Sequence, residues 1–163
     1  MGVLEASFFT CEEMLQEKGY LVYTNVGVSM MPLLRERRDI IEIHKKDPDI
    51  RCKKYDVVLY KQYNKYIVHR VLKVRLNDYV ICGDHNIYRE YGITDMQILG
   101  IMTRVIRDGK SIYPTDWKYK LYVHLWCDLY HVRAVILYLK RLTAVFAMRL
   151  KRRLKPYIKI RWR

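Results

Sequence analysis

Ser29 stands where a strand-forming run gives way to a turn. The stretch 26–34, VGVSMMPLL, follows an apolar, β-prone run at 20–23. Gly27 precedes the serine by two residues, and Pro32 disfavours helix at the residue before it. The pattern predicts a strand, a sharp turn that carries Ser29, and a short apolar segment. On the turn alone Ser29 is an ordinary turn serine, because serine is common in turns; a nucleophilic role needs a base elsewhere in the chain.

His69 is the best candidate for that base. A serine hydroxyl is a poor nucleophile unless a base removes its proton. The run 66–74 is β-prone, and strand alternation places His69 on one face with apolar Ile67 and Val71. An imidazole with the usual pKa of about 6.5 is mostly neutral at pH 7. A core histidine bonded to backbone would be the simpler interpretation without Ser29; with Ser29 present, we predict a general base.

A Gly-Asp pair ends the next expected strand. The run 79–82 continues into Gly83-Asp84-His85-Asn86. Asp84 is a candidate acid to orient the histidine, although Gly83-Asp84 also suits a simple turn in which the carboxylate bonds its own backbone. His85, beside this pair, is the alternative base.

Together these blocks resemble the signal-peptidase/LexA-like superfamily of serine peptidases. The matching features are G-x-S-M-x-P at 27–32, a strand with His-Arg-Val, and Gly-Asp-x-Asn, and the resemblance spans Leu21 to Ile106. It implies a serine endopeptidase that cleaves a precursor or leader peptide without a cofactor or metal. Bacterial-type signal peptidases and LexA-like proteins use a lysine base, whereas the endoplasmic-reticulum and spore-former types use histidine, so His69 matches the second group.

The same resemblance bears on the acid and on the oxyanion. Asp84 matches the first Asp of the family motif and is the expected acid. Where endoplasmic-reticulum-type enzymes place a further Asp, this chain has Arg89 followed by Glu90, so Glu90 is the fallback; a Ser–His dyad with no acid is also open. Signal peptidases usually carry a serine at the position of Gly27. Here the oxyanion would rest on backbone N–H groups at Gly27 and Ser29.

Short strands must position these residues. The β-prone runs, separated by turn residues such as Asn64, Asn77-Asp78 and Asp108-Gly109, predict a compact, mainly antiparallel β domain over residues 1–117. A short amphipathic helix is expected at 5–18, with Gly19 as its C-cap. The expected strands are 21–23, 39–43, 56–60, 66–74, 79–82 and 98–107.

The period changes after Pro114. Apolar residues then recur about every 3.6 positions, which predicts an amphipathic helical tail over residues 118–163 that ends at Pro156. A single helix from 118 to 155 would be about 55 Å long. The tail therefore either breaks and covers the β core, or lies in the plane of a membrane.

The charge is concentrated in that tail. The chain carries a net charge of +14, and from Lys118 onward Asp128 is the one acidic residue among many Lys and Arg. An anionic membrane surface is the expected partner, besides a peptide or protein precursor as substrate; nucleic acid is less favoured because no recognition motif accompanies the charge. A second hypothesis follows: a catalytically inactive binding module of the same fold that docks on anionic membrane or a partner through this tail.

Two further patterns bear on location. Residues 1–19 show neither a basic segment nor a sustained apolar run, so no signal peptide is expected. Four scattered cysteines without a C-x-x-C pair predict reduced thiols. We therefore expect a cytoplasmic protein, associated peripherally with the inner face of the membrane.

Overall fold

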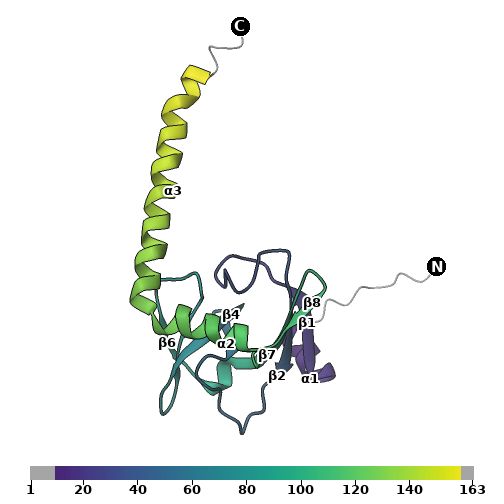
Figure 1. The fold of residues 1–163 in the computed structure, drawn as a ribbon. Helices are drawn as coiled ribbons and strands as arrows, with labels where there is room; N and C mark the ends of the chain where they lie inside the picture. The colour runs from purple at the N-terminus through teal and green to yellow at the C-terminus, as the bar shows by residue number, and fades with distance from the viewer. Residues whose placement is uncertain (1–9, 159–163) are drawn as a thin grey trace, which may run out of the picture. The chain divides into compact units, whose positions relative to one another are not determined.

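The computed structural model describes residues 10–158 and contains an eight-stranded antiparallel sheet (Figure 1). Seven strands lie in the order β1-β2-β7-β3-β4-β5-β6, and β8 pairs with β7. The mainly β, antiparallel fold expected from the sequence is confirmed. The strands are β1 (Tyr20–Thr24), β2 (Ile40–Lys45), β3 (Val57–Gln62), β4 (Lys65–Val74), β5 (Tyr79–Cys82), β6 (Glu90–Ile93), β7 (Ile98–Arg107) and β8 (Lys110–Ile112).

Helices flank the strands in the chain. A capping box between Thr10 and Glu13 starts α1, and Gly19 ends it with φ 75°, as expected. Residues 5–9 of the expected N-terminal helix lie outside the described residues. The helical segments are α1 (Cys11–Lys18), η1 (Asp95–Gln97), α2 (Trp117–Val123), η2 (a π-helical turn, His124–Asp128) and α3 (Tyr130–Ile158).

Tight turns join the central hairpins. Asp108 and Gly109 both have positive φ, 49° and 76°, and so do Tyr63 and Asn64 at 46° and 63°. Positive φ at both central residues is the type I′ geometry that matches the twist of paired strands. Residues 75–78 separate β4 from β5, and a hydrogen bond from the Arg75 N–H to the Asp78 carbonyl, 2.9 Å, closes this loop.

Two contacts of the β-sheet core matter for the site. The apolar segment that follows Ser29 is buried: Met30, Leu33 and Leu34 all belong to the larger core cluster.

Strand β6 was not predicted, since only Ile93 of its four residues is buried and the segment shows no alternation. It pairs with β5 and sets Glu90 opposite Ile81.

The compact β unit extends beyond the expected boundary at residues 117/118. The compact β unit runs to Asp128, and a second unit begins at Leu129. Helix α2 and the turn η2 belong to the first unit because Tyr119, Val123 and Cys127 are buried in its core cluster. The helix in the second unit also passes through Pro156 and ends at Ile158; proline disturbs the turn before it, while its own φ remains helical.

Candidate serine–histidine site

The Ser29 turn is anchored on both sides. Met30, 1% exposed, fixes it to the core, and Ser29 itself is half-buried. Gly27 has φ 104°, a conformation that favours glycine. The Asn25 side-chain amide donates to the Gly27 carbonyl at 3.1 Å. These contacts and the glycine conformation therefore hold the turn in one shape.

The turn docks directly on the Gly83–Asn86 loop. The His85 N–H donates to the Ser29 carbonyl oxygen at 2.7 Å. A methyl group at Gly83 would lie 2.6 Å from that carbonyl oxygen and 2.9 Å from His69 Nε2. The Ser29 backbone carbonyl and the His69 ring, which are far apart in the sequence, thus lie on either side of a glycine that leaves room for both.

His69 lies on β4 opposite Val58 of β3 and is 5% exposed. Its Nδ1 is 2.8 Å from Glu90 Oε1 and 3.1 Å from the Tyr60 hydroxyl. The single Tyr60 proton is donated to Glu90 Oε2 at 2.6 Å. This network assigns the proton on the ring to Nδ1, which faces two acceptors. The lone pair is then on Nε2, the nitrogen beside Gly83 and the Ser29 turn.

Burial and charge act in opposite directions on this ring. Burial lowers the pKa of His69 below its usual value, and the Glu90 carboxylate, which stabilises the imidazolium, opposes that shift without cancelling it. The imidazole is therefore neutral at pH 7 and able to accept a proton. Burial, followed by the nearby Glu90 charge, raises the pKa of Tyr60, so its hydroxyl stays protonated and keeps donating to Glu90.

Asp84 does not occupy the expected place of the acid. Its carboxylate is fully buried and accepts two hydrogen bonds from Arg70, Nε at 2.9 Å and Nη2 at 2.7 Å. Tyr122 donates a third, at 2.9 Å. Arg70 follows His69 on β4 and projects to the opposite face, so it engages Asp84 while Glu90 reaches the imidazole. The fallback residue, Glu90, is the one that contacts His69.

Residues that the sequence placed in the tail complete this buried pair. Arg70 Nη1 donates to the Tyr119 hydroxyl at 3.0 Å, and Trp126 Nε1 donates to the Asp84 backbone carbonyl at 2.8 Å. Together with Tyr122, these side chains hold the Gly83–Asn86 loop from the side of α2 and η2. Sequence reasoning missed these three residues and Tyr60, because aromatic residues at helical spacing or within strands carry no motif.

The remaining predicted groups have clear positions. Within residues 10–158 the Ser29 N–H has no hydrogen-bond partner, so it is available to an oxyanion. The His85 ring is not in the His69 network; its backbone N–H holds Ser29 instead. The four cysteines, all among the described residues, form no disulfide. In the described part of the chain, no cluster of three or more His, Cys, Asp and Glu could hold a metal ion.

A cavity of about 260 Å³ opens beside Ser29. Tyr23 of β1 and Val68 of β4 lie on its walls, although these strands are not neighbours in the sheet. Strand β5 pairs with β4 only from Arg70 onward. Residues 65–69 therefore have β3 on one side and, in the described structure, no strand on the other, which leaves backbone groups open to an extended peptide.

Gly83→Ala tests the close approach of Ser29 and His69. The added methyl group must push apart the Ser29 backbone and the imidazole, and a displacement near 1 Å costs about 10²-fold in rate. We expect the reaction of Ser29 with a fluorophosphonate to slow by about that factor. Gly100→Ala is the matched control, because its methyl group would lie 2.6 Å from the His44 carbonyl oxygen, on strands away from the site. Equal slowing in both variants, measured on folded protein, would contradict this geometry.

The described site combines a serine on a fixed turn, a histidine with its lone pair toward that turn, and a carboxylate on the far ring nitrogen. Such an arrangement can activate a hydroxyl for attack on a carbonyl or phosphoryl centre. Comparison of the chain with protein-family models, with curated proteins and with solved structures finds no match.

Proposed function

We propose that the protein is a serine endopeptidase of signal-peptidase-like type. Ser29 is the nucleophile, His69 the general base, and Glu90 the acid that orients the base. One observation supports the proposal: the Ser29 backbone carbonyl oxygen and His69 Nε2 both lie close to Gly83, while His69 Nδ1 is held by Glu90 at 2.8 Å. A core histidine would need a partner for Nδ1 but would have no reason to present Nε2 to a serine turn.

The proposed reaction proceeds through an acyl-enzyme. Ser29 Oγ attacks the scissile carbonyl carbon and its proton passes to His69 Nε2, which then protonates the leaving amine. Water, deprotonated by the same nitrogen, hydrolyses the ester and frees Ser29. The Ser29 N–H stabilises the oxyanion in both steps. Within residues 10–158 the Ser29 hydroxyl makes no hydrogen bond, so its bond to Nε2 forms when substrate is bound.

The proposed substrate is an extended segment of a precursor or leader peptide. The cavity beside Ser29 accepts a side chain adjacent to the cut bond, and the unpaired edge of β4 accepts the main chain. The alternative is a catalytically inactive binding module of the same fold that docks on anionic membrane or a partner through its basic tail. It predicts a Ser29 that does not react.

Covalent labelling tests the proposed function. We expect a fluorophosphonate probe to label the wild-type protein on Ser29, as mapped by peptide mass spectrometry, and Ser29→Ala to abolish labelling. Ser111→Ala is the control, since Ser111 is an exposed serine on β8. Wild-type protein that labels no more than Ser29→Ala, or labels on Ser111, would overturn the peptidase proposal in favour of the binding module.

Glu90→Gln tests the role of the acid. The variant removes the charge that raises the pKa of His69 and weakens the hold on Nδ1. We expect labelling at neutral pH to fall about 10²-fold. Because a more depressed His69 pKa leaves the ring neutral to lower pH, the acid limb of the pH–rate profile should also move to lower pH. A profile recorded over about pH 5 to 9 checks this shift.

The control for this variant is Glu17→Gln, which changes an exposed carboxylate in α1. It should leave both the rate and the profile unchanged. An acid limb that stays in place in Glu90→Gln would mean that this carboxylate does not act on His69.

A further inference from the structure

Helix α3 exposes a continuous row of apolar side chains. Val132, Val135, Leu139 and Leu142 are 53%, 58%, 53% and 48% exposed. Their spacing of three or four residues places them along one side of the helix. Scattered exposed apolar residues are ordinary, but a contiguous row of this kind marks a surface that meets something other than water.

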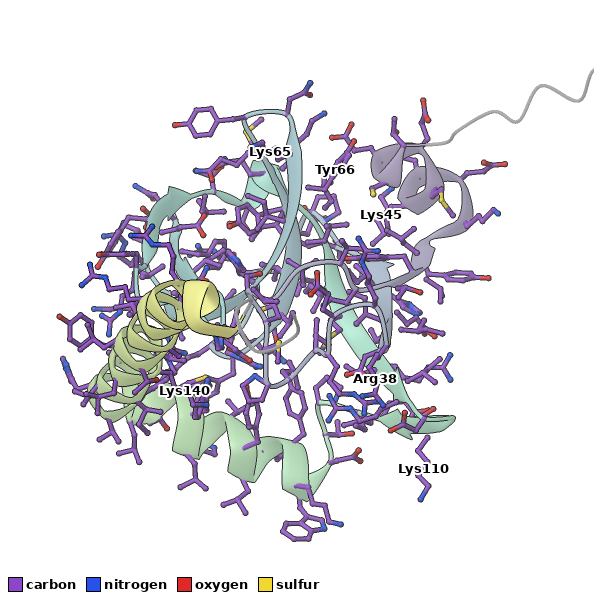
Figure 2. The ribbon with its side chains drawn as sticks, turned by 90° about the horizontal axis from the view of Figure 1, so that it is seen from above. Arg38, Lys45, Lys65, Tyr66, Lys110 and Lys140 are labelled. Carbon is purple, nitrogen blue, oxygen red and sulfur yellow. The ribbon has the colours of Figure 1, made fainter. Side chains whose placement is uncertain are left out.

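Cationic side chains border that row. Lys140 and Arg152 are exposed, and 3.6-residue geometry places one on each flank of the apolar row, with exposed Arg149 at the edge of the row beside Leu142. Figure 2 shows Lys140 on α3. The sequence after Asp128 holds eleven Lys and Arg and no Asp or Glu. An apolar stripe flanked by positive charge is complementary to a layer of anionic headgroups above acyl chains.

A spanning orientation does not fit α3. Among the described residues, no helix is long and apolar enough to cross a bilayer. We propose that α3 lies in the plane of an anionic membrane surface, with the apolar row among the upper acyl segments and the flanking cations at the lipid phosphates. This proposal is independent of the peptidase chemistry, because it concerns binding alone.

Other occupants fit the surface less well. A nucleic acid would satisfy the positive charge but leave Val135, Leu139 and their neighbours in water. A second copy of α3 would cover the apolar row but bring two strongly cationic helices together, which costs electrostatic free energy. An anionic bilayer satisfies both the apolar and the charged side chains.

Vesicle flotation of the full chain tests the proposal. The probes are vesicles of phosphatidylcholine alone and vesicles with about 30% phosphatidylglycerol. We expect at least tenfold stronger binding to the anionic vesicles, and weaker binding as salt rises from about 0.05 to about 0.5 M. Leu139→Ser combined with Leu142→Ser should weaken this binding at least tenfold. Lys140→Gln combined with Arg149→Gln should weaken it by a similar factor.

Matched controls come from the β unit. Leu76→Ser removes an apolar side chain that is 88% exposed. Lys65→Gln and Lys110→Gln remove cations that Figure 2 shows on other elements, at the start of β4 and of β8. These variants should bind vesicles as the wild type does, and circular dichroism should show the same helical content in all.

Three results would overturn the proposal. One is equal binding to neutral and anionic vesicles, and another is equal weakening by the control variants. The third is unchanged vesicle binding in the Leu139/Leu142 variant, which would reduce the interaction to charge alone.

A separate outcome would replace the membrane by another occupant. A dimer in solution that dissociates in the same variant, together with no vesicle binding, would assign the apolar row to a second copy of the chain.

Discussion

We expect His69→Ala to lower the rate at which Ser29 reacts with a fluorophosphonate by about 10³- to 10⁴-fold, which is the size of a lost general base. The reason is that, in the proposed mechanism, the Nε2 lone pair accepts the Ser29 proton, and Tyr60 and Glu90 keep that lone pair available by holding the ring proton on Nδ1. Stopped labelling reactions resolved by mass spectrometry measure this rate.

His85→Ala is the sharpest control for that loss. His85 was the alternative base from sequence, and its backbone N–H, which any residue retains, makes the contact with Ser29. The variant should react within a few-fold of the wild type. A His85→Ala rate as low as that of His69→Ala would mean that the proposal had assigned the base to the wrong histidine.

Asp84→Asn has the largest expected effect on stability. The change leaves the fully buried Arg70 guanidinium without its counter-ion, and breaking a buried pair in this way costs about 3–5 kcal/mol. For a chain of this size the melting temperature should fall by roughly 6–20 °C. Differential scanning calorimetry measures the shift. Asp108→Asn is the control, because its ion pairs with Arg35 and Arg38 are exposed and worth little.

The same variant separates a structural carboxylate from a catalytic one. Where Asp84→Asn is still folded, the acid limb of its pH–rate profile should move less than in Glu90→Gln, because the Asp84 charge has a smaller effect on the pKa of His69 than Glu90 has. An Asp84→Asn protein with wild-type stability and an acid limb shifted further than that of Glu90→Gln would restore Asp84 as the acid.

Local patterns were sufficient to select Ser29 and His69 as the proposed nucleophile and base. Ser29 lies on a turn that Gly27 and Pro32 predict, and alternation along a strand places His69 among apolar neighbours. Both inferences need only residues close in sequence. The strands themselves followed from β-prone runs between turn residues, so most strand positions agree with the expectation to within a few residues.

The acid could not be chosen in the same way. Which carboxylate meets His69 depends on the register of β6 against β5, and β6 is a four-residue strand with little pattern. Arg70, adjacent to His69, forms an ion pair with Asp84, which follows the neighbouring strand β5. Tyr60 follows only from the β3–β4 register, which sets Val58 opposite His69 and leaves Tyr60 on the diagonal.

The unit boundary was hidden by a continuous helical period. Apolar spacing runs unbroken from α2 into α3, so the sequence alone does not mark the change at Asp128. The π-helical turn between them shifts the register. It is this turn that carries Trp126, which reaches the loop beside the proposed site.

The Trp126 hydrogen bond places a fluorescent indole beside the proposed site. The indole is half-buried and bonded to the carbonyl of Asp84, one residue from the glycine at which Ser29 and His69 meet. Trp117 is 69% exposed and Trp162 lies outside the described residues. With both replaced by phenylalanine, the emission of the remaining indole should change whenever a bound peptide displaces that loop. Binding kinetics could then be followed without a label or a chromogenic substrate.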